Sequence, residues 1–421
     1  MLPLLVAFVV VSAASLFLKW INLRHQERAG GAVPPELADV VDAERLSRIA
    51  AYTRDRARFG IVTAVVRDVA MGVFLFGGLL GAYDRFVQGF GTSAVATGTL
   101  FFVGFSLVSA VLGIPFALYG SFVIEARHGF NRMSPALFWS DWLKSTVLSL
   151  AFVAALSALA FWVITLLPGS WWLFVWVLFI VLSVGITYLA PVLIEPLFFK
   201  MRPLHVEGLE AEVRALAEKA GVHVSRVLEV DASRRSSHSN AYFTGIGHVK
   251  RVVLFDTLFG QMKHGEILAI LAHELGHWRK HHVLMRTLLS YAVGFVALYL
   301  AFTFAPQGWV PGLVGLESAS FPARLVILGT LASVITFPLT PLSSYWSRRH
   351  EWQADAFAVA LHKRPEDLAN ALKKLASENL SNLHPHPFYA AFYYSHPPMP
   401  ERIRRLMDLR TAVAIDAPLH G

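Results

Sequence analysis

The stretch HGEILAILAHELGHWRKHH, residues His264 to His282, decides the fold class of this chain, because it joins a histidine-rich helix to an apolar segment. Its periodicity predicts an amphipathic helix, and residues 283–305 that follow are long and apolar enough to cross a bilayer. The stretch contains an HExxH motif formed by His273, Glu274 and His277. Residues four apart project from one face of a helix, so both histidines can direct a ring nitrogen at a single ion. The sequence therefore predicts a metal centre next to a membrane span.

Six further segments are apolar and long enough, or nearly so, to span a membrane, for which a helix needs roughly 20 residues. Hydrophobic residues make up 55% of the 421-residue chain and charged residues only 16%, which is typical of membrane proteins rather than of soluble multidomain proteins. The first segment carries its positive charges after the apolar run, at Lys19, Arg24 and Arg28, so we expect a retained span and not a cleaved signal. The seven expected spans cover residues 2–18, 61–83, 96–124, 145–167, 171–193, 283–305 and 323–342.

The basic residues between the spans predict the orientation of the chain, because Lys and Arg near a membrane are retained on the cytoplasmic side. Segments 19–60 and 125–144 are rich in them, whereas the alternate connections contain little more than Arg85 and Arg324. This asymmetry predicts a multi-pass membrane protein with its N-terminus outside, its C-terminus inside and the HExxH stretch on the cytoplasmic side. The same bias accounts for the net charge of +8, and no basic stripe interleaved with aromatic residues indicates nucleic-acid binding.

Arg67 and Asp68 interrupt the second apolar segment. A charged side chain that faces lipid is costly, so such residues usually face a protein interior or a water-filled cavity. Two interpretations remain open: a wet interior next to this span, or a span that begins after Asp68 and leaves both residues at the membrane interface.

The polar segments mix helix and strand. Residues 207–222 have helical periodicity, whereas RVLEVDA, NAYFTGI and VKRVVLFDT are β-branched and aromatic runs separated by Gly and Ser. These runs predict strands or a hairpin. We therefore expect a small α+β unit between the fifth and sixth spans.

Any metal centre here needs imidazole and carboxylate ligands, because the chain has no cysteine. In RRHEWQADAFA, after the seventh span, Glu351 and Asp355 stand four residues apart on an expected helix. Hydrolytic zinc sites usually take three protein ligands, so Glu351 is the predicted third ligand, and Asp355 is predicted to fix a ligating imidazole by a hydrogen bond. Taken alone, this segment also fits a solvated helix face. His281 and His282 are expected at the membrane interface.

The chain resembles the type I CAAX prenyl proteases, seven-span zinc metalloendopeptidases of membranes. The resemblance implies a mainly α membrane protein: seven transmembrane helices surround an intramembrane chamber, capped by a cytoplasmic α+β zinc metalloprotease domain of the gluzincin-like type. The motifs that carry it, in the order of the family, are FVIEARHGFNRMS (Phe122–Ser134), PVLIEPLFFKMRPL (Pro191–Leu204), SHSNAYFTGIG (Ser237–Gly247), LAHELGHW (Leu271–Trp278), EWQADAFA (Glu351–Ala358) and SHPPMPERI (Ser395–Ile403).

The resemblance also implies four consecutive regions. An N-terminal membrane domain with five spans covers residues 1–197, and a cytoplasmic protease segment with the substrate strand and the HExxH helix covers 198–282. Spans six and seven occupy 283–346. A C-terminal protease segment with the third zinc ligand covers 347–421.

In the metal site, the resemblance implies one zinc ion per chain, held by His273, His277 and Glu351, with Glu274 as the catalytic residue. Glu274 would act as a general base toward the attacking water and later protonate the leaving amine.

For substrate binding, the resemblance implies a strand at Asn240, Ala241 and Tyr242, which an extended peptide would join by backbone hydrogen bonds. His396 is expected to stabilise the oxyanion. Arg402 is expected to bind a substrate or product carboxylate, and a structural ion pair is an equally good interpretation.

The expected activity is hydrolysis of peptide bonds near the C-terminus of peptides or membrane proteins, prenylated or plain, in contact with membrane lipid. The chain ends in DAPLHG without an endoplasmic-reticulum retention signal and is rich in Ala and Arg, which favours a bacterial cytoplasmic membrane. Two alternatives remain: a broad-specificity quality-control protease, and a transporter whose histidines bind a permeating metal ion.

Overall fold

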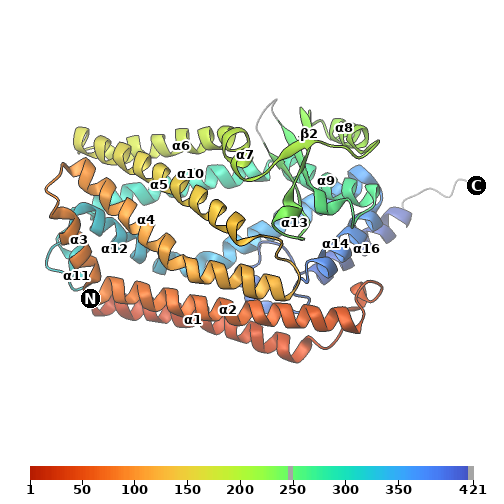
Figure 1. Cartoon of the computed structure of the whole chain (residues 1–421), viewed down its shortest axis with the longest axis horizontal. Helices are drawn as coiled ribbons and strands as arrows, with labels where there is room; N and C mark the ends of the chain where they lie inside the picture. Colours follow the sequence, from red (N-terminus) through yellow and green to blue (C-terminus); the bar gives the residue numbers. More distant parts are fainter. Residues whose placement is uncertain (245–249, 416–421) are drawn as a thin grey trace, which may run out of the picture.

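The computed structural model of the chain describes residues 1–244 and 250–415, and its parts are mostly helices arranged lengthwise (Figure 1). Within these described residues, seven helices, each from 23 to 42 residues long, are long and apolar enough to cross a membrane. The predicted fold class, a mainly α membrane protein with seven spans and a small sheet, is therefore confirmed. The N-terminus lies at one end of the long axis and the sheet near the other (Figure 1).

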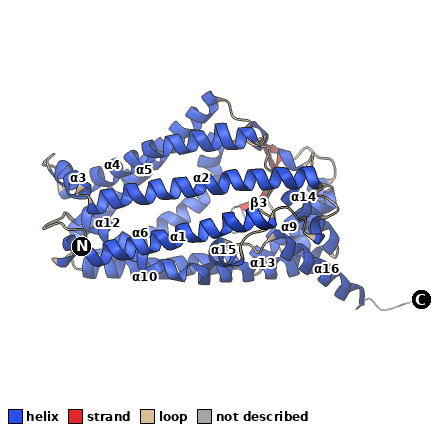
Figure 2. Ribbon diagram, turned by 90° about the horizontal axis from the view of Figure 1, so that it is seen from below, coloured by secondary structure: helices blue, strands red, loops and turns tan. Residues whose placement is uncertain are grey.

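The spanning helices run side by side along the long axis (Figure 2). Their side chains face outward to a large extent; Val69, Val181 and Val293, for example, are each 60% exposed, as expected of lipid-facing positions. The helices are α1 (Leu2–Ala29), α2 (Ala43–Phe76), α4 (Ala94–Tyr119) with the π-helical turn η2 (Gly120–Glu125), α5 (Pro135–Leu166), α6 (Trp171–Leu189) with η3 (Ala190–Ile194) and α7 (Glu195–Phe198), α10 (His282–Phe304), and α12 (Phe321–Thr336), continued through η6 (Phe337–Leu339) into α13 (Thr340–His362).

The second span differs from its prediction at both ends. The helix α2 begins at Ala43, well before the apolar run, because Asp42 caps it by accepting a hydrogen bond from Arg45 N. It ends at Phe76, with Gly77 as its C-cap, and Gly78 adopts φ +83°, which favours glycine. A separate helix, α3 (Leu79–Gln88), follows. The basic residues expected in the connection 19–60 therefore lie largely on helical extensions beyond the apolar segments.

The small sheet has four strands in the order β1-β2-β4-β3. The inner strands β2 (Arg226–Val230) and β4 (Arg251–Phe255) are parallel, and β1 (Met201–Pro203) and β3 (Ala241–Thr244) each pair antiparallel at an edge. The predicted strands are confirmed; Gly245 to Gly247 of the third motif lie outside the described residues. The sequence does not indicate β1, which has only three residues and ends in Pro203.

Helices cover the inner face of this sheet. The remaining helices are α8 (Leu209–Lys219), α9 (His264–Arg279), α11 (Trp309–Gly312), α14 (Pro365–Glu378), α15 (Pro387–Tyr393) and α16 (Met399–Ile415). Side chains of α8, α9 and α14 pack with Val252 and Leu254 of β4 in the largest core. Val252 and Leu254 are both fully buried. Successive strand residues point to opposite faces, and Val253 accordingly belongs to a small cluster on the outer face.

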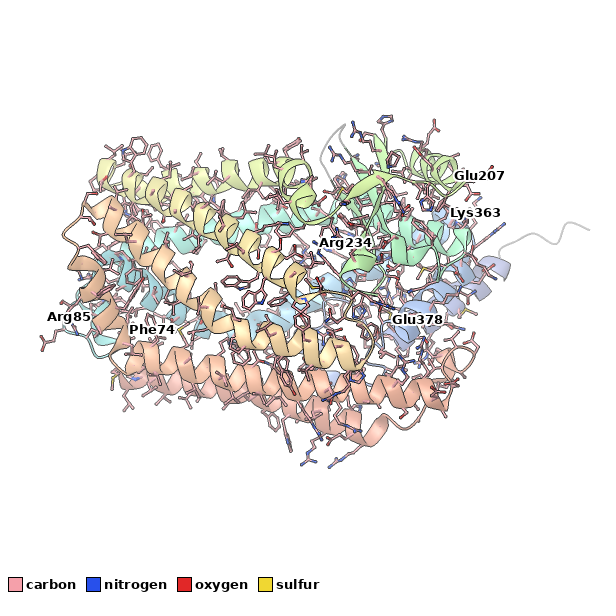
Figure 3. The ribbon with its side chains drawn as sticks, in the orientation of Figure 1. Phe74, Arg85, Glu207, Arg234, Lys363 and Glu378 are labelled. Carbon is pink, nitrogen blue, oxygen red and sulfur yellow. The ribbon has the colours of Figure 1, made fainter. Side chains whose placement is uncertain are left out.

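A second core lies at the opposite end of the molecule, where Leu75, Leu80, Phe101 and Ile327 are fully buried. Asp84 is also buried there and accepts hydrogen bonds from the backbone nitrogen and hydroxyl of Ser320, ahead of α12. Figure 3 shows Arg85 at this end and the charged side chains of Glu207, Lys363 and Glu378 at the end that carries the sheet. The molecule is therefore packed tightly at both ends of its spans.

Candidate active site

The HExxH helix α9 and the helix α13 touch at two small residues. A Cβ atom on Gly276 would lie 3.0 Å from Ala354 Cα and 3.1 Å from Ala354 O. Such distances leave no room for a side chain, so the two backbones meet directly. Gly276, the small residue beside His277, allows this close approach. The contact brings the HExxH motif alongside Glu351.

Three potential metal ligands converge at this contact. One ligand atom each of His273, His277 and Glu351 lie within 4.8 Å of one another. The two Nε2 atoms are 3.2 Å apart, and they lie 3.4 and 3.3 Å from the two oxygens of Glu351. Ligands at about 2.0–2.1 Å from a tetrahedral ion are separated by roughly 3.3 Å. The spacing therefore fits a zinc-sized cation, although the roles of the three residues remain a prediction.

The donor chemistry also favours a cation. Glu351 Oε2 is buried and meets only long contacts among the described residues, 3.4 Å to His273 Nε2 and 3.6 Å to Arg402 Nη1, and a buried carboxylate oxygen without a close partner is costly. Two imidazole nitrogens at 3.2 Å would moreover bring two lone pairs together unless a proton or a metal ion lies between them. A metal ion removes both difficulties at once.

An aspartate binds the Nδ1 atom of His273, the nitrogen that does not face the other two ligands, as the spacing of Glu351 and Asp355 predicted. Its Nδ1 lies 2.8 Å from Asp355 Oδ1. Arg402 binds the same carboxylate with two nitrogens, at 3.0 and 2.6 Å, and has only 5% of its side chain exposed. Burial lowers the pKa of His273, but the hydrogen bonds to Asp355 and Glu351 outweigh it and raise the pKa to about 9. The geometry of Arg402 favours the structural ion pair over direct substrate binding.

A further histidine, His282, contacts His277. His282 was expected at the membrane interface, but it is 1% exposed, and its Nδ1 lies 3.0 Å from His277 Nδ1. Its Nε2 lies 2.8 Å from Gln353 Oε1, and its ring stacks on His350 with centroids 4.0 Å apart. The cause is His281, whose left-handed backbone (φ +58°) breaks the helix and turns the next residue inward. His281 itself is exposed.

Glu274 lines a cavity next to these ligands. Burial raises the pKa of its carboxyl, and the neighbouring His273 and His277 act in the opposite direction. A carboxylate of raised pKa is a better proton acceptor, which suits a general base.

His396 also lines the cavity, next to Glu351. Its Nε2 lies 3.4 Å from Glu351 Oε1, and Ser395 Oγ lies 2.9 Å from its Nδ1. The side chain is 59% exposed, so it can reach a bound ligand. Burial by the cavity wall lowers the pKa of His396, partly offset by Glu351. An imidazole placed here can donate a hydrogen bond to an oxyanion.

The expected substrate strand forms an edge of the sheet. β3 pairs with β4 on one side only, which leaves its other backbone edge without a partner strand among the described residues. Asn240 and Ala241 line the cavity, and Asn240 Oδ1 accepts from Ala241 N at 2.9 Å. Tyr242 points to the opposite face of the sheet, toward Phe255. Burial there, next to Glu195, raises the pKa of Tyr242 to about 12.

A segment from the membrane part holds the start of this strand. His238 stacks on Phe130 with ring centroids 4.0 Å apart, and its two nitrogens lie 3.0 Å from Asn379 Oδ1 and 3.3 Å from Glu125 Oε2. Ser237 N also donates to Phe130 O at 3.2 Å. The motif FVIEARHGFNRMS thus gains a structural explanation: it anchors the strand next to the cavity.

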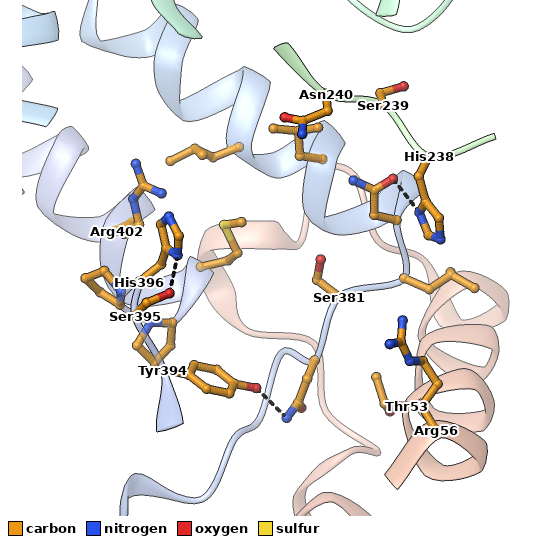
Figure 4. Close-up of a pocket in the computed structure, with 18 of the residues that line it drawn as sticks. Thr53, Arg56, His238, Ser239, Asn240, Ser381, Tyr394, Ser395, His396 and Arg402 are labelled. Carbon is orange, nitrogen blue, oxygen red and sulfur yellow. Dashed lines mark hydrogen bonds between the residues drawn. The ribbon is translucent and has the colours of Figure 1, made fainter. Parts of the chain in front are cut away.

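One cavity of about 1040 Å³ has among its lining residues His238, Asn240, His273, Glu274, His396 and Arg402 (Figure 4). Sequence reasoning missed several of its polar residues, namely Tyr52, Arg56, Asn379, Asn382 and Tyr394. The only signal in the sequence was the run of arginines in 45–58, and it does not say which of them faces inward.

Comparisons with known proteins agree with this arrangement. Residues 22–200 match the family model described as the CAAX prenyl protease N-terminal domain with five membrane helices, and residues 203–410 match peptidase family M48. The chain is 34% identical over 388 residues to CAAX prenyl protease 1 homolog of Arabidopsis thaliana, covering 89% of this chain and 90% of the relative. It is 31% identical to CAAX prenyl protease 1 homolog of Homo sapiens, covering 90% and 89%.

A solved structure shares the whole architecture. The crystal structure of S. mikatae Ste24p superposes with a TM-score of 0.88 at 28% sequence identity, covering 96% of this chain and 99% of that one. The similarity covers nearly the full length of both chains and includes both the membrane part and the peptidase part. The chain belongs to the CAAX prenyl protease family and is a membrane-embedded zinc metalloendopeptidase of the M48 type.

Proposed function

We propose that this enzyme binds one zinc ion through His273, His277 and Glu351, and cleaves CAAX-type peptides or membrane proteins near their C-terminus. The observation that carries the proposal is the convergence of His273, His277 and Glu351: the two Nε2 atoms are 3.2 Å apart, and each lies 3.3 to 3.4 Å from one of the two oxygens of Glu351. Glu274 lies beside them and lines the large cavity. The relatives are named as CAAX prenyl proteases, which supports the substrate class.

Zinc, when bound, lowers the pKa of a water molecule toward about 7 and polarises the scissile carbonyl. Glu274 takes the proton of the attacking water and passes it to the leaving amine, a role that typically contributes about 10²–10⁴-fold in rate. His396 donates a hydrogen bond to the oxyanion. The proton from Glu274 completes the new amino terminus of the released fragment.

The free edge of β3 supports binding of an extended peptide by backbone hydrogen bonds. The cavity reaches from this edge to side chains of α1 and α2, which belong to the membrane part. A substrate segment that leaves the bilayer can therefore remain in contact with both parts, lipidated or not. Cleavage rates for farnesylated and plain versions of one peptide will show whether the lipid is required.

Of the alternatives, a quality-control protease would use the same chemistry on broader substrates. Lack of preference between CAAX-type and unrelated quenched peptides would favour it. A metal-ion transporter requires a site near the membrane midplane, whereas Glu351 lies on a helix segment beyond the apolar run of its span.

The proposal includes a bacterial cytoplasmic membrane with the site facing the cytoplasm. The excess of Lys and Arg at the end of the molecule that carries the sheet supports this orientation. Because the chain has no cysteine, single-cysteine variants can test it. Lys363→Cys should react with an impermeant maleimide only from the cytoplasmic side, and Arg85→Cys only from the outside. The reverse labelling pattern would invert the orientation.

Purified protein assayed for zinc content and for cleavage of a quenched peptide tests the catalytic proposal. We expect Glu274→Gln to retain about one zinc per chain and to lose cleavage by roughly 10²-fold or more, while His273→Ala and Glu351→Ala lose the metal as well. Cleavage by Glu274→Gln at the wild-type rate would show that Glu274 is not the general base. Cleavage by metal-free protein would remove the whole mechanism.

A further inference from the structure

The cavity that contains Glu274 has one guanidinium group that the proposed chemistry does not use. Among the described residues that line it, Glu274 is the only carboxylate, and Arg56 and Arg402 are the arginines. Arg402 is bound by Asp355 on two nitrogens and is 5% exposed. The Arg56 side chain is 60% exposed. Only Arg56 therefore has a guanidinium open to a ligand in the cavity.

Arg56 is fixed on one side and open on the other. Its Nη1 donates to Tyr52 Oη at 2.9 Å, and its guanidinium carbon lies 5.6 Å from the centroid of the Tyr52 ring. Glu125 Oε1 is 3.6 Å from Nη1, beyond hydrogen-bond distance, and accepts from Tyr52 Oη instead. A guanidinium has five N–H donors. Most of them remain for a ligand, in the planar fork that suits a carboxylate.

The surroundings add a second positive charge. Arg56 also borders a smaller cavity of about 370 Å³, which Lys19, Arg67 and Glu125 line as well. Arg67 is paired with Asp68 at 2.9 Å. Lys19 has no hydrogen bond or salt bridge among the described residues. Glu125 is the only carboxylate among the described residues that line this smaller cavity, and Lys19 and Arg56 are two cations on the same lining. This excess of positive charge favours an anion.

The position of Arg56 fits one end of a bound peptide. Figure 4 shows Arg56 and Thr53 on the side of the pocket opposite His396 and Arg402, with Asn240 and His238 between them along the top of the view. A peptide that pairs antiparallel to β3, the commoner pairing in sheets, places its C-terminal residues past the start of that strand. His238 precedes the strand and is linked through Glu125 to Tyr52 and Arg56. The C-terminus is thereby directed toward Arg56.

We propose that Arg56, with Lys19 behind it, binds the free α-carboxylate of the peptide substrate. This inference rests on the proposed function and deepens it. Each extended residue spans about 3.3 Å, so a carboxylate anchor at a fixed distance from Glu274 selects a bond a fixed number of residues from the chain end. The enzyme would then select its cleavage site by the distance to the C-terminus.

The test compares two quenched peptides of one sequence, one with a free C-terminal carboxylate and one with a C-terminal amide. Charge-assisted hydrogen bonds are worth about 1.5–3 kcal/mol, so the wild-type enzyme should prefer the carboxylate peptide in kcat/KM by about 10- to 100-fold. Arg56→Gln should reduce this ratio to near one, and Arg56→Lys should keep part of it. The same ratio should appear in binding of labelled peptides to Glu274→Gln protein, which needs no cleavage.

Arg58→Gln provides the matched control. Arg58 lies two residues along the same helix, pairs with Glu27 at 3.1 Å and borders a different cavity. Its substitution should leave the preference for the carboxylate peptide unchanged. A wild-type enzyme that treats both peptides alike, or an Arg56→Gln variant that keeps the full ratio, would overturn the assignment. Because the ratio is also read from binding, failure of the anchor is distinguishable from failure of the peptidase function.

Discussion

Each of the two HExxH histidines on α9, His273 and His277, has its Nδ1 fixed by a different partner. Asp355 holds His273 and is itself held by Arg402. His282 holds His277 and is itself within 2.8 Å of Gln353 Oε1. If His282 Nε2 donates to that amide oxygen, its Nδ1 is left as an acceptor for the Nδ1–H of His277. The Nε2 of His277 then faces the metal site as a lone pair, which is the tautomer that a metal ion requires.

We predict that His282→Ala weakens zinc binding by about 10- to 100-fold, the usual effect of removing a group that orients a metal ligand. Competition with a chromogenic chelator measures the affinity, and thermal unfolding of the metal-free protein shows separately whether the fold is intact. The control is His281→Asn, since His281 is the exposed neighbour and asparagine tolerates its left-handed backbone. Equal zinc affinity in His282→Ala and wild type would contradict the orienting role.

At this scale the sequence predicted which side chains share a helix face better than it predicted which residues meet through backbone turns and packing. The spacing of Glu351 and Asp355 predicted that an acid would lie behind a histidine, because residues four apart share a helix face. The role of His282 depends on the left-handed backbone of His281, which no local pattern indicates. The inward position of Arg56 depends on how α2 packs against η2, and a run of arginines does not reveal it.

At the scale of elements, the site exists because α9 and α13 approach to backbone contact at Gly276 and Ala354. The helices belong to distant parts of the chain. Their contact sets the distance from His277 to Glu351, so a change of a few tenths of an ångström there alters the metal geometry directly. Helix propensity opposes the glycine, which costs roughly 0.5–1 kcal/mol relative to alanine inside a helix.

The substitution Gly276→Ala tests whether the close contact with Ala354 or the low helix propensity of glycine has the larger effect on stability. Overpacking against a backbone typically costs about 1–3 kcal/mol, more than the helix gains from alanine, so we expect a lower unfolding midpoint together with weaker zinc binding. Gly329→Ala is the control: Gly329 is helical, and its added Cβ would meet nothing within 4 Å. That variant should be neutral or slightly stabilised. A Gly276→Ala protein with unchanged zinc affinity would show that the close contact does not determine the site.

The elements themselves were predictable to different degrees. Long apolar runs indicate a span reliably, since burying polar backbone in lipid leaves few alternatives. Their ends are less predictable, because α2 continues in water from Ala43 with its own cap at Asp42. The edge strand β3 was predictable as a strand. Its anchoring by Phe130 and His238 was not, because the two residues lie far apart in sequence and meet only in the folded molecule.

At the scale of the whole molecule, the two large cores lie at opposite ends of the spans, and the spans themselves bury few residues between them. The metal site lies in the core that contains the sheet, and its ligands come from α9, before the sixth span, and from α13, the part of the seventh spanning helix beyond its apolar run. A bound ion therefore joins segments that are separated in the chain by two membrane crossings.

This connectivity predicts that zinc stabilises the folded state in addition to supporting catalysis. A ligand that binds only the folded state at 1,000 times its Kd stabilises by about 4 kcal/mol. Removing zinc with a chelator should therefore lower the thermal unfolding midpoint of the wild-type protein in detergent, and added zinc should restore it. Glu274→Gln should respond in the same way, because Glu274 is not among the three ligands. Glu351→Gln, which lacks the carboxylate from α13, should show little response to either addition. A wild-type midpoint that is unchanged after complete removal of the metal would mean that the contact between α9 and α13 holds the two segments together without the ion.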